Sequence, residues 1–145
     1  MSTGRPVLAG VLFGVGAAGF LDETVFHQLL HWHHFYDRST PDAGLVSDGL
    51  LHAGSWICTV AGLFLYADLR RRGLRRTRPL WAGTLLGFGA FQVYDGLVQH
   101  KLLDLHQIRY GVELLPYDAA WLAVGTAAIV AGLLLLRPGR ARTST

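Results

Sequence analysis

Four long apolar segments limit the folds that are open to this chain. They run from about Pro6 to Leu30, Gly49 to Ala67, Pro79 to about Leu103, and Ala119 to Leu136. Each is close to the ~20 helical residues that a bilayer crossing needs. Hydrophobic residues make up 51% of the 145 residues and charged residues only 16%, a balance untypical of a soluble domain. The sequence therefore predicts an all-α membrane protein, a four-helix bundle with four transmembrane helices in the lipid bilayer.

The basic residues are unevenly distributed among the segments between these spans. In a four-span arrangement, one side carries Arg5, Arg70, Arg71, Arg72, Arg75, Arg76, Arg78, Arg137, Arg140 and Arg142. The other side carries only Arg38, Lys101 and Arg109. Because cytoplasmic loops are rich in Lys and Arg, both termini are expected in the cytoplasm. The loops at about 34–47 and 106–117, and all seven histidines, then lie at the extracytoplasmic end, and nucleic acid is not an expected partner.

An internal repeat divides the chain into two halves. Residues 5–33 align with residues 78–106 at a constant offset of 73, with fourteen of twenty-nine positions identical. A weaker match at offset 70 pairs Asp48 with Asp118. We expect one transmembrane domain, 1–145, made of two parallel two-helix repeats, about 5–67 and 78–137, with an arginine-rich loop at 68–78 and a tail at 138–145.

The repeat also bears on the start of the chain. Arg5 and the apolar run after it fit a cleaved signal peptide as well as a retained helix. The repeat aligns this run with the internal span at 79–103. We therefore expect it to be retained as a transmembrane helix.

The pattern Asp-x4-His-x5-His occurs once in each half. It comprises Asp22, His27 and His33, then Asp95, His100 and His106. A carboxylate inside a membrane helix needs a partner, so both acids are expected to face the interior. On a regular α-helix, residues five apart diverge by about 140°, so a single helix does not easily direct both side chains at one atom. Two copies facing each other can converge.

Further polar residues extend this candidate site. His31 lies one helical turn after His27, and His52 lies near the start of the second span. The predicted metal ligands are His27, His52, His100, Asp22, Asp95, His33, His106 and His31. Asp48, Glu23 and Asp104 are expected to hold and orient the imidazoles. Imidazole with carboxylate suits a transition metal ion such as zinc, iron or copper(II).

Simpler interpretations apply to several of these residues. The aromatic residues Trp32, Phe35, Tyr36, Tyr110, Tyr117 and Trp121 fit an interfacial belt. Asp48 and Asp118 each stand near the start of a span, where they would act as helix N-caps. Asp22 and Asp95 would alternatively pair with Arg38 and Arg109.

Three sequence stretches resemble the prokaryotic membrane-protein family catalogued as domain of unknown function 2243. They are "GFLDETVFHQLLHWHH", "SDGLLHAGSW" and "YDGLVQHKLLDLHQIR". The resemblance covers about residues 8–136 and implies a four-span protein of a prokaryotic plasma membrane, without a settled activity. Family members usually have Gly where this chain has Glu23, and often have Glu at the position of Asp95.

The leading functional hypothesis is a metal-binding membrane protein, with a metal-dependent oxidoreductase favoured over a hydrolase because no general base stands apart from the ligand set. One alternative is a haem protein with His27 and His100 as axial ligands. Another is a metal-delivery or assembly factor for a respiratory complex, or a small transporter. A homodimer or a larger membrane complex is the expected assembly.

Overall fold

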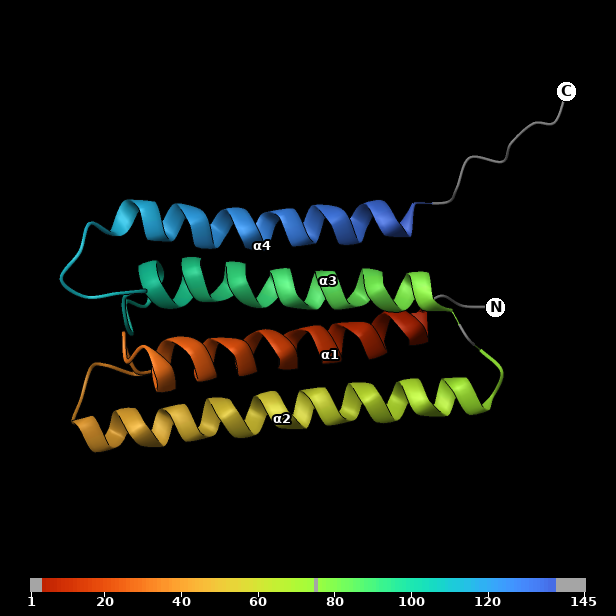
Figure 1. The fold of residues 1–145 in the computed structure, drawn as a ribbon, viewed down its shortest axis with the longest axis horizontal. Coiled ribbons are helices and arrows are strands. Elements are labelled where there is room, and N and C mark those ends of the chain that lie inside the picture. Colours follow the sequence, from red (N-terminus) through yellow and green to blue (C-terminus); the bar gives the residue numbers. More distant parts are fainter. Residues whose placement is uncertain (1–3, 75, 138–145) are drawn as a thin grey trace, which may run out of the picture.

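A computed structural model describes residues 4–74 and 76–137, and within those ranges the chain forms helices and no strands. The elements are α1 (Gly4–Asp22), the π-helix η1 (Glu23–Leu29), α2 (Pro41–Arg71), α3 (Thr77–Tyr94), the π-helix η2 (Asp95–Leu102) and α4 (Leu114–Leu136). Arg75, Arg140, Arg142 and the tail at 138–145 lie outside the described residues. The helices lie in the order α2, α1, α3, α4, with α1 and α3 running in one direction and α2 and α4 in the other (Figure 1).

Three of the described helices are long and apolar enough to cross a membrane. They are Gly4–Leu29, Pro41–Arg71 and Leu114–Leu136, with mean hydropathies of 1.5, 1.5 and 2.2. The remaining predicted span, 79–103, forms α3 and η2 and is not among them. It carries Gln92 and Asp95, which are polar but buried inside the bundle. The four-span arrangement thus remains a prediction. The segment 79–103 is less apolar than the other three because it contains these inward-facing polar residues.

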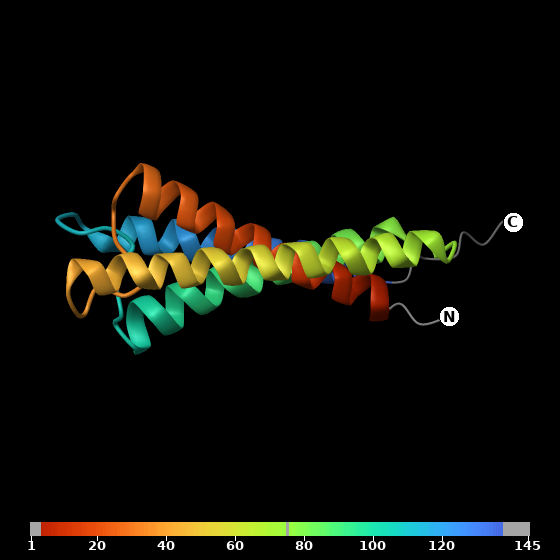
Figure 2. The same ribbon diagram turned by 90° about the horizontal axis from the view of Figure 1, so that it is seen from below.

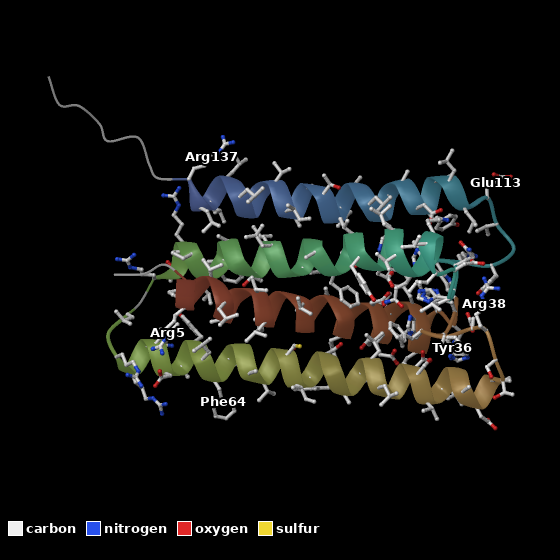
Figure 3. All side chains as sticks on the ribbon, turned by 180° about the vertical axis from the view of Figure 1, so that it is seen from behind. Arg5, Tyr36, Arg38, Phe64, Glu113 and Arg137 are labelled. Carbon is white, nitrogen blue, oxygen red and sulfur yellow. The ribbon has the colours of Figure 1, made fainter. Side chains whose placement is uncertain are left out.

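The outer surface of the bundle is apolar, as α2 illustrates. Its buried residues include Ser55, Gly62 and Leu69, which recur every seven residues and form one inward stripe. Leu50, Ile57 and Phe64, also seven apart, are 70–72% exposed. Phe64 points away from the neighbouring helices in Figure 3. Such large exposed apolar side chains indicate a surface that lies against lipid.

The first halves of α1 and α3 are in backbone contact through glycines. A Cβ atom built on Gly10 or Gly14 of α1 would lie 2.1 Å from a carbonyl oxygen of α3. Gly83 and Gly87 of α3 meet α1 in the same way, at 2.1 and 2.3 Å. Small residues spaced four apart allow this approach in membrane helices. Beyond this contact α1 and α3 cross and diverge toward the end that carries η1 and η2 (Figure 2).

The starts of α2 and α4 differ from the sequence-based prediction. α2 begins at Pro41, and the side chain of Thr40 caps it by accepting a hydrogen bond from the amide of Ala43 at 3.3 Å. α4 begins at Leu114. Asp48 and Asp118 therefore lie inside their helices, and the interpretation of both residues as N-caps is wrong. Their side chains are free to serve the polar cluster at this end of the bundle.

We expect opposite effects from one substitution at two helical glycines. Gly87→Ala places a methyl group against the carbonyl oxygen of Val11, at 2.3 Å, and forces α1 and α3 apart. Gly49→Ala meets no atom within 4 Å and gains about 0.5–1 kcal/mol from helix propensity. Thermal unfolding of both variants in detergent measures the effects. A Gly87→Ala variant as stable as the parent protein would contradict the close contact.

Candidate metal centre

The two π-helices place the repeated Asp and His side chains together. A π-helix bonds residue i to residue i+5 and so widens the turn. Such bonds close η1 and η2, where the amides of Leu30 and Leu103 donate to carbonyls five residues earlier at 2.9 and 2.7 Å. Asp22 Oδ2 lies 3.7 Å from Nε2 of His27. Across the bundle, the Asp95 Oδ2 to His100 Nε2 distance is 3.0 Å. The prediction that an Asp and the His five residues later point in different directions is therefore wrong, because it assumed a regular α-helix.

Each π-helix ends in a left-handed residue that reverses the chain. His31 has φ 51° and its counterpart Asp104 has φ 50°. His and Asp are among the residues that tolerate this conformation best. The backbone then forms equivalent bonds in both halves, from the amides of Trp32 and Leu105 to carbonyls six residues earlier, each at 2.9 Å. The need for this turn is enough to explain why His31 and Asp104 occupy matching positions, and it requires neither residue to bind a metal ion.

Beyond each turn, a histidine returns into the bundle and is held by the opposite half. Nδ1 of His33 donates to the carbonyl oxygen of Ile108 at 2.9 Å. Nδ1 of His106 donates to the carbonyl oxygen of Phe35, also at 2.9 Å. Burial lowers the pKa of His33 to about 2, assisted by its neighbours His106 and His27. His33 is therefore neutral, with the lone pair on Nε2.

Six side chains meet in a buried cluster, which we name the His4Asp2 cluster. Its members are Asp22, His27, His33, Asp95, His100 and His106, all at most 6% exposed. The His33 and His106 rings stack at 4.5 Å, with His27 4.5 Å from His33 and His100 4.7 Å from His106. Figure 3 shows nitrogen and oxygen atoms gathered between the helices at this end, beside the labelled Tyr36.

The inward atoms of the cluster lack hydrogen-bond partners. They are Nε2 of all four histidines and both carboxylate oxygens of Asp22 and Asp95, where the 3.0 Å contact of Asp95 Oδ2 with His100 Nε2 is close enough for a charge interaction but lacks hydrogen-bond geometry. Ligand atoms of Asp22, His27 and His33 lie within 4.8 Å of one another, as do those of His33, His100 and His106. Glu23, His27 and Asp48 form a third such group, so that His27 and His33 each belong to two of the three. Buried polar groups without partners are rare in proteins, so this set of atoms requires an explanation.

His27 is oriented by two further carboxylates. Its Nδ1 lies 2.8 Å from Glu23 Oε2 and 3.1 Å from Asp48 Oδ1. Asp48 also contacts Nδ1 of His34 at 2.6 Å and accepts from the amide of Phe35 at 2.7 Å. One buried residue of α2 thus fixes both an imidazole and the loop after η1. Hydrogen bonding at Nδ1 directs Nε2 toward the cluster, as in many metal sites.

The second half repeats this support less completely. Nδ1 of His100 lies 3.8 Å from Asp118 Oδ1, too long for a hydrogen bond. The other oxygen of Asp118 pairs with Lys101 at 2.5 Å. At the position of Glu23 stands Gly96, packed against Trp121. Neighbouring carboxylates therefore hold His27 more closely than they hold the equivalent His100.

Other sequence-predicted residues lie outside the cluster. His52 is half-buried on α2 and accepts from Trp56 Nε1 at 3.1 Å, and His31 is exposed. Asp104 pairs with Arg38 at the surface. Arg109 lies over the ring of Trp32, so neither arginine neutralises Asp22 or Asp95.

Two supporting residues give no signal through their side chains. Ile108 and Phe35 contribute only their carbonyl oxygens, which any residue would supply. Their positions, 73 apart, follow the repeat offset, and this was the available clue.

The helical architecture, the lipid-type surface and the buried polar cluster define a helical membrane protein. The chain belongs to the DUF2243 family of predicted membrane proteins, whose family model matches residues 9–139. This match confirms the family that the sequence motifs resemble. No curated protein and no solved structure matches the chain.

Removing the carboxylate of Asp48 tests the support of His27. We expect Asp48→Ala to weaken metal binding about 10- to 100-fold, because the imidazole loses its orienting partner while the His4Asp2 cluster stays intact. Asp42→Ala, in the exposed first turn of the same helix, is the matched control. Competition with a metallochromic chelator measures the affinity. Equal weakening in both variants would count against an orienting role.

Proposed function

We propose that this protein is an integral membrane protein that binds a transition metal ion in the His4Asp2 cluster. The observation that supports this best is the convergence of four imidazole nitrogens and two carboxylates, all buried and with no partner for these atoms outside the cluster. A bound cation would neutralise the two carboxylates, which otherwise carry a large desolvation penalty at this depth.

The ligand types favour iron first, then copper(II) or zinc. Asp22, His27 and His33 form a set of two histidines and one carboxylate. In the other half, Asp95 lies 3.0 Å from Nε2 of His100 and 3.6 Å from Nε2 of His106. This set with open positions is typical of non-haem iron(II) oxygenases. When bound, such a metal would supply redox chemistry, and the protein would hold it, exclude water and fix the imidazole tautomers. We therefore propose a metal-dependent oxidoreductase.

We further propose that all four helices cross the plasma membrane as two parallel repeats, with the cluster at the extracytoplasmic end. Matched contacts 73 residues apart support the repeat, such as Gly10 against Leu80 and Gly83 against Val7. Arg5 and Arg137 lie at the end opposite Tyr36 and Arg38 (Figure 3), which fits cytoplasmic termini.

A haem centre is less well supported. Its predicted axial ligands, His27 and His100, have the His33 and His106 rings beside them. Those two rings stack on each other at 4.5 Å. A porphyrin bound by His27 and His100 would have to displace them. A protein that delivers metal to a larger complex would use the same cluster. It would differ from the proposed oxidoreductase in releasing the ion.

His33→Ala is the sharpest test of metal binding in the His4Asp2 cluster, because His33 belongs to both groups of three ligands that lie within that cluster. We expect the parent protein in lipid nanodiscs to retain about one metal ion per chain or more after dialysis, and the variant to lose most of it. His31→Ala and His52→Ala are the controls, since both lie outside the cluster. Elemental analysis gives the result, and equal metal content in parent and His33→Ala would refute the site.

The redox proposal makes a separate prediction. Supplied with equal iron(II), copper(II) and zinc, the protein is expected to bind a redox-active metal that titrates reversibly between two oxidation states. Electron paramagnetic resonance during a potentiometric titration measures this. Retention of zinc alone would contradict an oxidoreductase while leaving the metal site in place.

A further inference from the structure

A cavity of about 450 Å³ lies between α1 and α4, beside the His4Asp2 cluster. α3 separates these two helices and forms the floor, contributing Phe88 and Gln92. Leu21 and Val124, on opposite walls, are 51% and 52% exposed on the apolar outer surface. The cavity therefore opens sideways, at the level of the lipid, and its volume is that of a small-molecule site.

Aromatic rings form much of the cavity wall. Phe26 contacts Trp32 and Trp121 with ring centroids 5.2 and 5.3 Å apart, and Trp32 meets Tyr117 at 5.8 Å. The guanidinium of Arg109 lies behind two of these rings, 4.9 Å from the Trp32 ring centroid, and donates to the Tyr117 hydroxyl at 2.8 Å. Walls of this kind favour a flat apolar ring.

One charged residue lines the cavity, and it belongs to the cluster. Asp22 is 2% exposed and neither of its carboxylate oxygens has a partner. Both oxygens are covered in this structure; with one directed to a metal ion, the other would accept a hydrogen bond from a molecule in the cavity once the side chains that cover it move aside. A neutral hydroxyl donor suits this position, because a charged amine would have to leave water and enter an apolar passage.

A second cavity, at the equivalent place between α2 and α3, serves as an internal comparison. It measures about 290 Å³ and is lined by Val15, Phe35, Leu50, Leu51, Gly54, Ser55, Cys58 and Phe91. No carboxylate lines it, and its wall has two aromatic rings where the first cavity has five. Both the polar acceptor and the aromatic slot are thus specific to the α1–α4 cavity.

We propose that the α1–α4 cavity binds a membrane-soluble aromatic alcohol, of the phenol or hydroquinone class, with its hydroxyl group donating to Asp22. The ligand enters from the bilayer. This inference builds on the proposed metal centre, since the hydroxyl would lie next to it, and it names the substrate class of that centre. Binding in the cavity is nevertheless measurable by itself, because Asp22 and the aromatic wall belong to the protein.

The test compares pentamethylphenol with its methyl ether, pentamethylanisole, which has the same ring but no hydroxyl donor. The protein is used in lipid nanodiscs, both metal-loaded and chelator-treated, and calorimetry against empty nanodiscs gives the dissociation constants. We expect saturable binding of one phenol per chain and at least about tenfold weaker binding of the ether, because the ether leaves the buried carboxyl oxygen without a hydrogen bond.

Two tryptophan substitutions on α4 locate the binding. Ala120→Trp fills the cavity from an exposed position, and we expect it to abolish phenol binding. Ala119→Trp introduces the same side chain at the neighbouring exposed residue, which does not line the cavity, and should leave binding unchanged. Neither residue belongs to the His4Asp2 cluster, so both variants should keep the metal content of the parent protein.

The outcomes separate this inference from the metal proposal. Equal affinity for phenol and ether would overturn it, because the cavity would then be an unselective apolar slot such as one for a lipid tail. Absence of phenol binding, or its survival in Ala120→Trp, would overturn it too. Each of these results leaves the metal content unaffected. Phenol binding by a parent protein that retains no metal would instead refute the proposed function alone.

Discussion

The structure depends on the burial of two carboxylates among apolar helices. Asp22 and Asp95 are at most 2% exposed and lie where the chain is otherwise packed for lipid. Ionised groups at such depth are tolerated only with partners, and the nearest groups are imidazoles rather than arginines. The divergence of α1 and α3 at this end leaves room for these imidazoles, and Asp48 of α2 holds one of them.

The two halves of α1 and α3 have opposite packing requirements. Toward their N-termini, glycines bring the backbones into direct contact, and no side chain fits between them. Toward their C-termini, the same helices must leave room for six polar side chains. Because α1 and α3 cross, they satisfy both demands. The wider turns of the π-helices η1 and η2 then direct the polar side chains inward. A continuous pair of α-helices would satisfy only the first.

Sequence reasoning recovered the helices, the family and the six residues of the cluster, because apolar length and repeated polar motifs are direct physical signals. It missed the start of α2, although Thr40 followed by Pro41 is a recognisable helix start. It assumed regular α-helices through Asp22 and Asp95, since the sequence offers no distinct signal for a π-helix. For that reason His31, one α-helical turn from His27, was expected in the site, whereas the structure uses it for a left-handed turn.

The exchanged contacts of the two loops have a consequence for how this end of the molecule forms. His33 is held by the carbonyl of Ile108, and His106 by the carbonyl of Phe35, so each loop positions the histidine of the other. Neither imidazole reaches its place until both loops have folded. We therefore expect the two loops to become ordered together, and a half-length chain would need a second copy of itself to complete the same arrangement.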